Sequence, residues 1–362
     1  MRITAAVFEQ RNEPFALRNL ELASPGDGEL IVEILATGIC HTDLGMQAFH
    51  PTPSVLGHEG CGRVIECGPG VKSLSKGDLV VLTFGSCGSC GNCHRDLPSH
   101  CEHMMALNFG GKSPSGELTL KTEDGEGVHG SFFSQSSFAS HALVTERNAI
   151  AISDPEASPA MLAPLGCGVQ TGAGAVTNTL DVGQGSSFVC FGVGAVGLSG
   201  IMAAKLRGCE TIIAVDLHKD RLDLALELGA THVLEGNPEA GKAITELTKG
   251  GADYALETAG TLDTFHNAIS CTRMGGHTAI VTVPNWAEGF HFNAADLALG
   301  RTVTGVLEGS SRPQQFIPQL YEWFQQGQMP LDKMVKEYPF NDINQALKDL
   351  ESGKTIKPVL VL

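Results

Sequence analysis

The chain has 362 residues, more than one hydrophobic core usually supports, so we expect two domains. Its residues are 42% hydrophobic and 18% charged, which is typical of a globular protein and excludes extended disorder. The 44 glycines favour a β-rich or α/β chain over a helical bundle. With 40 acidic against 24 basic residues the formal net charge is −16, which disfavours nucleic acid and anionic membrane surfaces as partners.

Two stretches bear on location. Residues 1–15 contain no apolar core of signal-peptide length, so we expect a cytoplasmic protein. Residues 182–204 carry no charge and are long enough to span a bilayer, but their six glycines favour a short strand between two turns. Eleven cysteines in a cytoplasmic chain indicate metal or redox chemistry, because disulfides do not persist there.

Short apolar runs separated by turn residues fill the first hundred residues. The runs at 29–39, 62–68 and 77–84 are rich in β-branched residues and are bounded by Gly, Pro or Asp. This pattern predicts strands of an antiparallel or barrel-like sheet.

From about residue 168 the sequence pattern changes and predicts strands that alternate with helices. The pattern predicts strands at 186–192, 211–216, 231–236, 252–260 and 275–284, and its clearest helices lie at 196–208 and 219–230. Such alternation implies right-handed βαβ crossovers and a doubly wound parallel sheet, the Rossmann pattern.

Beyond residue 306 the chain offers two amphipathic helices, at 313–327 and 343–353, and a terminal strand. These elements are too few for a core of their own, so we expect them to pack on the first domain. The predicted domains are therefore 1–167 together with 307–362, which include a cysteine-rich lobe at about 86–102, and the Rossmann domain 168–306.

A glycine motif follows the first strand of the Rossmann pattern. Gly192, Gly194 and Gly197 match GxGxxG, in which the glycines permit a tight turn, close approach of a pyrophosphate and close helix packing. Asp216 ends the next strand, at the position of the acid that binds the adenosine ribose. Because a carboxylate there repels the extra phosphate of NADP, the motif predicts NAD. Lys219 and Arg221 are candidates for the same ribose, although a solvated helix face explains them equally well.

Four cysteines close together form a strong metal motif. Cys87, Cys90, Cys93 and Cys101 have the spacing CxxCxxCx7C, which supplies four thiolates from one segment and predicts a closed, structural zinc site. An iron–sulfur cluster is the competing interpretation. A zinc ribbon that binds nucleic acid is disfavoured by the acidic charge.

A second set of ligands is dispersed along the chain. Cys40 in GICHTD, His58 in GHEG and Cys167 in PLGCGVQTG would give three ligands and one open position, the arrangement of catalytic zinc. The remaining cysteines lie outside any ligand motif and are interpreted as core or near-surface residues: Cys61, Cys67, Cys190, Cys209 and Cys271.

With these motifs the chain resembles the zinc-containing alcohol dehydrogenases of the medium-chain dehydrogenase/reductase superfamily, most of all the benzyl or aryl alcohol dehydrogenase group, over essentially its whole length. The resemblance implies a GroES-like β-rich catalytic domain split around a Rossmann coenzyme domain. It implies two zinc ions per chain, NAD as coenzyme, and reversible hydride transfer that converts a primary alcohol, of aromatic or allylic type, into an aldehyde. A homodimer or homotetramer is the expected assembly.

The resemblance also assigns roles around the catalytic zinc. Cys40, His58 and Cys167 would hold the metal, with water or the substrate oxygen as the fourth ligand. Asp43 would orient His58, and Glu59 would lie behind the metal.

Further roles concern the proton and the coenzyme. Thr42 matches the hydroxyl that bonds the alcohol and passes its proton on, while His41 and Lys357 match contacts to the coenzyme pyrophosphate. Better-known members place a histidine where this chain has Gly45. The proton relay would therefore end at the coenzyme ribose and solvent, or use another base such as His50.

Other functions share some of these motifs. A glutathione-dependent formaldehyde dehydrogenase or a polyol dehydrogenase would differ only in the substrate pocket. A non-catalytic zinc and dinucleotide scaffold would not need the dispersed ligands together with Thr42. For the pocket itself the sequence suggests Phe84, Phe138 and Leu307, each of which is equally compatible with an ordinary core position.

Overall fold

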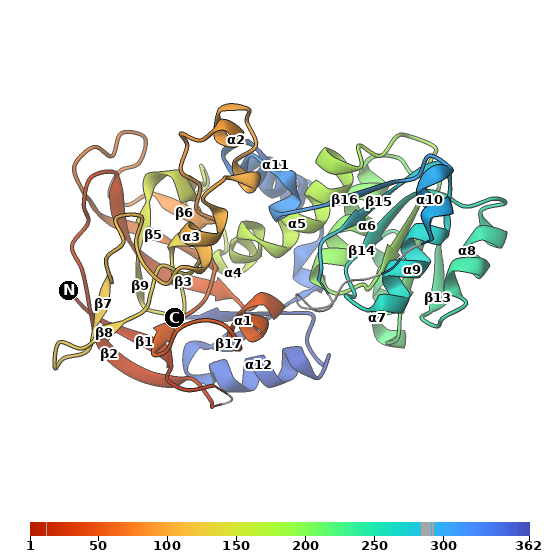
Figure 1. Ribbon diagram of the computed structural model, residues 1–362. Helices are drawn as coiled ribbons and strands as arrows, with labels where there is room; N and C mark the ends of the chain where they lie inside the picture. Colours follow the sequence, from red (N-terminus) through yellow and green to blue (C-terminus); the bar gives the residue numbers. More distant parts are fainter. Residues whose placement is uncertain (12, 284–290, 292) are drawn as a thin grey trace. The chain divides into compact units, whose positions relative to one another are not determined.

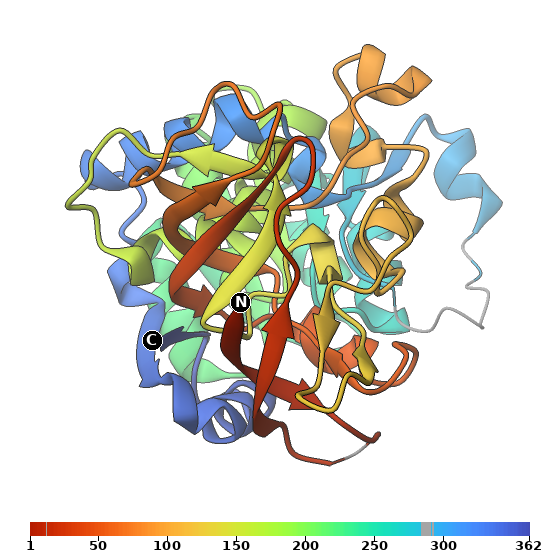
Figure 2. The same cartoon turned by 90° about the vertical axis from the view of Figure 1, so that its left-hand side faces the viewer.

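The computed structural model describes residues 1–11, 13–283, 291 and 293–362, which form two compact units. The first unit comprises Met1–Cys167, Arg312–Glu322 and Leu331–Leu362, and the second comprises Gly168–Ser311 and Trp323–Pro330. The first is β-rich and the second is α/β (Figures 1 and 2). The predicted fold class, a β-rich domain split around a Rossmann domain, is therefore confirmed, while the exact domain limits stay a prediction.

The second unit contains a six-stranded parallel sheet (Figure 1). Its strands are β11 (Ser187–Phe191), β12 (Thr211–Asp216), β13 (His232–Glu235), β14 (Ala252–Glu257), β15 (Thr272–Ile280) and β16 (Thr302–Gly305). Their order is β13-β12-β11-β14-β15-β16, so the direction of winding reverses between β11 and β14. A reversal of this kind leaves the crevice at the carboxyl ends of the strands in which dinucleotides bind.

Six helices accompany this sheet in the part of the unit that the structure describes; α5 precedes its first strand and the others connect its strands. They are α5 (Gly168–Gly174), α6 (Ala195–Leu206), α7 (Lys219–Leu228), α8 (Ala240–Leu247), α9 (Leu262–Ser270) and α10 (Ala294–Ala298). Helix α6 contacts α5 and α7, whereas α8 contacts α9. Because βαβ crossovers are right-handed, the two directions of winding place these groups on opposite faces of the sheet.

The uncharged stretch 182–204 becomes strand β11 and most of helix α6. Phe188, Val189 and Phe191 are fully buried in the sheet, and α6 buries Ile201 and Met202. A strand and helix covered on both sides need no charged residue, which explains the composition. Within the described residues, no helix combines the length and the apolar character needed to cross a bilayer.

The first unit contains two antiparallel-rich sheets (Figure 2). One consists of β10 (Ala149–Ala151), β6 (Leu79–Leu82), β5 (Glu59–Cys67), β3 (Glu29–Gly38), β18 (Lys357–Val361) and β17 (Val335–Pro339), with β9 (His141–Thr145) also paired to β3. The other consists of β4 (Ser54–Val55), β1 (Arg2–Phe8), β2 (Ala16–Leu22), β7 (Leu120–Lys121) and β8 (Gly127–Val128). Val359 of β18 pairs with Gly38 of β3, so the end of the chain lies beside the strand that leads to Cys40.

Short helices complete the first unit. They are α1 (His41–Met46), α2 (Gly91–His94), α3 (Met104–Phe109), α4 (Pro159–Leu162), α11 (Pro313–Gln325, which ends in the second unit) and α12 (Ile343–Glu351). Helix α12 buries Ile343, Ala346 and Leu350 in the same core as Phe8 and Phe138. The C-terminal segment therefore joins the N-terminal sheets, as its short amphipathic pattern predicts.

The carboxylate of Asp349 joins helix α12 to neighbouring side chains through hydrogen bonds. The dependence of protein stability on acidic pH tests this role. It accepts hydrogen bonds from Tyr338 Oη at 2.7 Å, Gln345 Nε2 at 2.8 Å and Lys354 Nζ at 3.2 Å. These bonds, that of Tyr338 above all, lower the pKa of Asp349 to about 2. Because the folded pKa lies below the unfolded value of about 3.9, this stabilisation is present above pH 4 and is lost as the pH falls toward 2.

We therefore expect Asp349→Asn to lower the melting temperature at pH 7 and the difference from the parent to shrink between pH 4 and pH 2. Differential scanning calorimetry measures both. Asp342→Asn, at an exposed position next to the same helix, is the control and should change little at any pH. A difference for Asp349→Asn that is constant with pH would contradict the assignment.

Candidate active site and zinc centres

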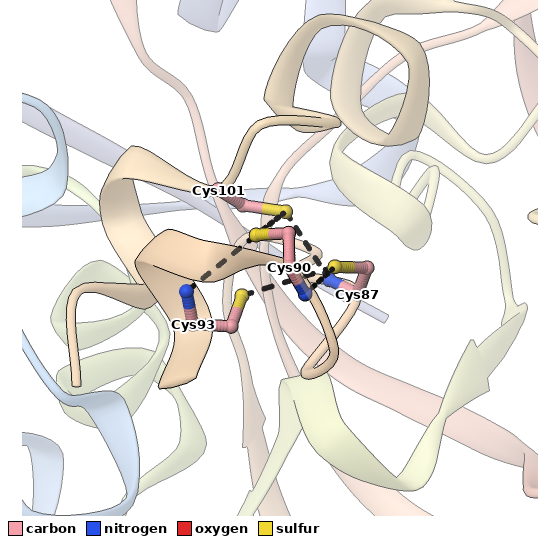
Figure 3. Close-up of side chains that lie close together, drawn as sticks. All are labelled: Cys87, Cys90, Cys93 and Cys101. Carbon is pink, nitrogen blue, oxygen red and sulfur yellow. Dashed lines mark hydrogen bonds between the residues drawn. The ribbon is translucent and has the colours of Figure 1, made fainter. Parts of the chain in front are cut away.

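The four clustered cysteines converge on one point (Figure 3). Their sulfur atoms lie within 4.8 Å of one another, with Cys87 Sγ 3.9 Å from Cys93 Sγ and Cys90 Sγ 3.9 Å from Cys101 Sγ. Four thiolates at about 2.3 Å from a zinc ion form a tetrahedron with edges of about 3.8 Å. The cluster therefore fits a tetrahedral zinc ion that has no place for a further ligand.

Backbone amides favour the thiolate form in this lobe. Ser89 N and Cys90 N donate to Cys87 Sγ at 3.4 and 3.2 Å, and Glu102 N donates to Cys90 Sγ at 3.4 Å. Although burial raises the pKa of Cys87, the hydrogen bonds from Ser89 lower it to about 6. The pKa of Cys90 is lowered as well, whereas burial raises the pKa of Cys93 to about 12 and also that of Cys101, so only two of the four thiols are shifted toward the thiolate form that binds metal.

A second cluster brings together Cys40, His58, Glu59 and Cys167, whose ligand atoms also lie within 4.8 Å of one another. Cys40 precedes helix α1, His58 immediately precedes β5, Glu59 is the first residue of β5, and Cys167 follows a 3-10 turn, Ala163–Gly166. The three dispersed ligands of the sequence thus meet inside the first unit. Such a meeting depends on the sheet, because no two of the three segments are neighbours along the chain.

Asp43 organises this cluster from within helix α1. It is fully buried, and its Oδ1 accepts from Gly57 N at 3.1 Å and lies 3.0 Å from His58 Nδ1, while its Oδ2 accepts from Cys40 N at 2.9 Å. One carboxylate therefore fixes the backbone at Cys40 and the ring of His58. The predicted orienting role matches this geometry.

The chemistry of the donors fits zinc. His58 is fully buried and its Nε2 has no hydrogen-bond partner, while its Nδ1 faces Asp43. A buried imidazole nitrogen without a partner is costly unless a metal or a ligand uses it. Contacts with Cys167 and then His58 hold the pKa of Cys40 well below its ordinary value, against the effect of burial. Two sulfurs and one imidazole are a known catalytic zinc set with an open fourth position.

Glu59 lies beside these ligands and is held by Lys357. Lys357 Nζ donates to Glu59 Oε1 at 2.9 Å, to Glu59 Oε2 at 3.0 Å and to Ile39 O at 3.1 Å, and both charged side chains are buried. Burial alone lowers the pKa of Lys357, but Glu59 raises it above its ordinary value. The ammonium group of Lys357 is thus directed at Glu59. Its contact with the coenzyme pyrophosphate stays a prediction, and it would require Lys357 to give up its hydrogen bonds to Glu59.

Helix α1 carries the residues predicted to handle the proton and the coenzyme. Thr42 Oγ1 lies 3.7 Å from Cys40 Sγ, and His41 is exposed in the first turn. A Cβ added at Gly45 would meet nothing within 4 Å, so the position of the missing relay histidine borders open space. Within the described residues His50 shares no hydrogen bond with Thr42, because its Nδ1 faces Pro51 O and Ser54 Oγ.

Aromatic rings that the sequence analysis did not single out cover His58. Phe133 stacks on the His58 ring at a centroid distance of 4.4 Å, and Phe132 meets it edge-on at 5.5 Å. Phe109 contacts both phenylalanines, at 6.0 and 5.1 Å. We call Phe109, Phe132 and Phe133 the aromatic wall; it lies directly against His58, one of the predicted zinc ligands.

The pocket residues suggested from the sequence stay predictions. Phe138 is fully buried in the core, where its ring meets Phe15 edge-on. Phe84 lines a cavity of about 150 Å³ beside Cys93 and outside the dispersed ligand set. Leu307 belongs to the second unit and is 45% exposed. A single apolar residue in a sequence does not indicate which group it will contact. For the same reason the sequence analysis did not identify the SFFSQSS segment, which contains two residues of the aromatic wall.

Strained backbone presents the wall. Ser131, Phe133, Ser134 and Ser136 have φ values of 56°, 50°, 57° and 55°, in the left-handed region that bulky residues rarely adopt. Gln135 holds the segment in place: its Nε2 donates to His58 O at 2.9 Å and its Oε1 accepts from Gly60 N at 3.1 Å. Strain of this kind persists only where the surroundings fix it, and it concentrates at functional sites.

The glycine motif of the second unit has the geometry that its spacing predicts. Gly192 has φ +83°, and a Cβ there would lie 2.9 Å from Ala259 N. A Cβ on Gly197 would lie 2.0 Å from Gly192 O, so helix α6 packs closely only because residue 197 is glycine. Gly194 is the N-cap residue of α6, whose first amides are directed at the end of β11.

Asp216 stands at the end of β12 and braces the glycine turn. Its Oδ2 accepts from Val193 N at 2.8 Å and its Oδ1 accepts from His218 N at 2.9 Å. Arg221 approaches the same carboxylate at 3.9 Å and is largely buried. Lys219 is 85% exposed and forms an ion pair with Asp223. This arrangement agrees with the alternative interpretation of Lys219, that it belongs to a solvated helix face.

Comparison with known proteins identifies the family. Residues 26–154 match the alcohol dehydrogenase GroES-like domain, and residues 195–326 match the zinc-binding dehydrogenase family. The chain is 41% identical to geraniol dehydrogenase of Castellaniella defragrans, over 99% of this chain and 97% of that protein. It belongs to the zinc-containing alcohol dehydrogenases of the medium-chain superfamily. The predicted family, its use of zinc and its action on small alcohols are therefore confirmed.

Solved alcohol dehydrogenases share the whole fold. A zinc-binding alcohol dehydrogenase domain protein from Burkholderia ambifaria superposes with a TM-score of 0.97 at 46% identity, covering 100% of this chain and 99% of that one. Benzyl alcohol dehydrogenase from Acinetobacter calcoaceticus superposes with a TM-score of 0.95 at 42% identity, with the same coverage. The iron–sulfur, nucleic-acid and scaffold interpretations of the sequence have no support in these likenesses.

Metal analysis of ligand variants tests both zinc centres. We expect about two zinc ions per chain in the parent protein and about one in either Cys40→Ser or Cys101→Ser, because each variant breaks one cluster. Cys40→Ser should abolish turnover while leaving the melting temperature close to that of the parent. Cys101→Ser should lower the melting temperature by several degrees, since a closed zinc site stabilises the fold.

Atomic emission spectrometry and thermal denaturation provide these readouts. Cys67→Ser, an exposed cysteine outside both clusters, is the control and should keep the full zinc content. A Cys40→Ser protein that retains the parent's zinc and activity would rule out the dispersed cluster as the catalytic centre.

Proposed function

We propose that this alcohol dehydrogenase oxidises aromatic and allylic primary alcohols reversibly to aldehydes with NAD as coenzyme. The aromatic wall against His58 carries the proposal. Planar unsaturated groups pack favourably on phenylalanine rings, by about 0.5–1.5 kcal/mol per ring pair beyond simple burial. The names of the relatives agree, since geraniol is an allylic alcohol and benzyl alcohol an aromatic one.

In this proposal the chain's own residues position the substrate and move its proton. Zinc held by Cys40, His58 and Cys167 would supply Lewis-acid polarisation of the alcohol oxygen. Thr42, in the first turn of helix α1, would accept the alcohol proton through its hydroxyl and pass its own proton on to the coenzyme ribose and solvent. Phe132 and Phe133 would exclude water and orient the substrate carbon chain, while Asp43 keeps His58 in place.

The coenzyme assignment depends on Asp216. Its carboxylate is 8% exposed and both oxygens accept backbone amides, so its position is fixed. A fixed negative charge at the ribose favours two hydroxyls over a 2′-phosphate. His41 and Arg221 are the further coenzyme contacts that we propose. The assembly that we propose is a homodimer or homotetramer, which light scattering measures.

A glutathione adduct of formaldehyde is the second candidate substrate. It carries carboxylates that need basic partners, whereas the groups against His58 are phenylalanines. Polyols need several hydroxyl partners, which rings do not offer. We therefore rank both below aromatic and allylic alcohols.

Steady-state kinetics of the parent and of Phe133→Leu test the substrate class. We expect kcat/KM for benzyl alcohol and geraniol to exceed that for ethanol and for S-hydroxymethylglutathione by at least about tenfold, or 1.4 kcal/mol of transition-state binding. Phe133→Leu should reduce the ratio of benzyl alcohol to ethanol about five- to tenfold. Phe15→Leu, a core ring away from His58, is the control and should keep that ratio. A parent enzyme that prefers ethanol or the glutathione adduct would refute the substrate class.

Coenzyme preference is tested with Asp216→Asn. The amide oxygen can still accept from Val193 N, but the NH2 group cannot accept from His218 N, so the variant removes the charge together with one of the two hydrogen bonds of the turn. We expect the ratio of kcat/KM for NAD to that for NADP to fall at least about tenfold. Asp223→Asn, an exposed acid on helix α7, is the matched control. An unchanged ratio would show that another group sets the preference.

A further inference from the structure

Two histidines outside both zinc clusters have buried ring nitrogens without partners. His50 is 1% exposed and its Nε2 has no hydrogen-bond partner. His129 is half-buried, and its Nδ1 is likewise buried and without a partner. Among the described residues, four buried side-chain nitrogen or oxygen atoms have no hydrogen-bond partner. One of these four is His58 Nε2, which belongs to the catalytic zinc set. An imidazole nitrogen in this state is costly unless a ligand uses it.

The two rings converge at Gly111. A Cβ built on Gly111 would lie 3.0 Å from His129 Nδ1 and 3.3 Å from His50 Cε1, the carbon bonded to the free Nε2. Gly111 has φ +69°, a conformation that disfavours any side chain there. A side chain at residue 111 would therefore press against both rings, and glycine avoids this contact.

Backbone contacts fix both histidines around this space. His129 N donates to Pro53 O at 2.9 Å, and Val55 N donates to His129 O at 2.9 Å. Gly130 N donates to Gly111 O at 3.2 Å, so the glycine is tied to the strand that carries His129. The two rings are thus presented by three segments that are connected through main-chain hydrogen bonds.

The hydrogen bonding of His50 leaves a lone pair at Nε2. Its Nδ1 lies 3.3 Å from Pro51 O, a group that can only accept, and 3.2 Å from Ser54 Oγ, which can also accept; a proton on Nδ1 serves both contacts and leaves Nε2 as the basic nitrogen. A histidine that donates from one nitrogen to a backbone carbonyl and offers the other is the usual form of a metal ligand. Burial, and to a smaller extent His129, lowers the pKa of His50, so this neutral form prevails at neutral pH.

We propose that His50 Nε2 and His129 Nδ1 bind a first-row transition-metal cation, such as Zn²⁺ or Co²⁺, at a third metal site beside Gly111. Imidazole nitrogens suit these cations, and water would complete the coordination because the described residues place no third His, Cys, Asp or Glu ligand with the pair. The net charge of −16 favours the approach of a cation.

The site borders the aromatic wall. The Phe132 ring meets His50 edge-on at a centroid distance of 5.4 Å and meets His58 edge-on at 5.5 Å. One phenylalanine therefore separates the proposed site from the ligand of the catalytic zinc. The two sites share no ligand, so the third can fill while both zinc centres stay occupied.

The experiment counts metal on the zinc-loaded, full-length protein. The protein is dialysed to equilibrium against Co²⁺, and cobalt plus zinc per chain are measured by atomic emission; exchange at existing sites leaves this total unchanged. We expect the total to rise from about two to about three metal ions in the parent protein. Half-saturation should need at least tenfold more Co²⁺ in His129→Gln and in His50→Gln, and the double variant should stay at about two.

His141→Gln is the matched control, because His141 is also half-buried in the first unit but its Nδ1 already pairs with Ser140 Oγ at 3.0 Å. It should reach the parent's total. His129→Gln keeps the test valid if the buried His50 variant fails to fold, since His129 is partly exposed and each variant's folding is checked by thermal denaturation. A parent total that stays at about two, or one that rises equally in His129→Gln, overturns the proposal.

Discussion

The buried carboxylate of Asp43 is the constraint on which the active site depends. It accepts from the amides of Cys40 and Gly57 and faces His58 Nδ1, so one side chain joins helix α1 to the segment before β5. A buried charge is tolerated only when such partners satisfy it, and here they are the same groups that carry the metal ligands. The ligand geometry is therefore built into the fold, and it does not depend on the metal alone to draw the segments together.

Next to this rigid centre the chain accepts strained backbone. Four residues between Ser131 and Ser136 are left-handed without being glycine, and they bring Phe132 and Phe133 against His58. Gln135 and Ser136 hold the segment through bonds to His58 O and Val55 O. Such strain costs on the order of 1–3 kcal/mol per residue, which the surrounding core must offset. The aromatic wall is thus a feature that the tertiary structure maintains.

The two zinc centres illustrate two ways to build a metal site. The lobe takes Cys87, Cys90, Cys93 and Cys101 from one short segment, so local chain geometry suffices and all four corners are filled. The catalytic set needs the ends of β3 and β5 and the turn before Cys167 to meet, and it supplies only two sulfurs and one imidazole, with the Glu59 carboxylate beside them. A site that must admit substrate gains from ligands on rigid strands, because their positions then survive the exchange of the fourth ligand. A closed site has no such requirement.

Local signals in the sequence determined the Rossmann order, the glycine turn with Asp216, the four-cysteine lobe and the family, because each depends on residue type at short, fixed spacing. The dispersed ligands could be named from their motifs, but only the sheet pairing brings Cys40, His58 and Cys167 within reach of one ion. Three outcomes were decided by the tertiary structure alone. Lys357 faces Glu59, and Phe132 and Phe133, not Phe84 or Phe138, cover His58. In addition, His50 and His129 meet at Gly111. Those outcomes depend on which face of each segment is buried and on left-handed backbone, and neither is encoded by periodicity in a single stretch of chain.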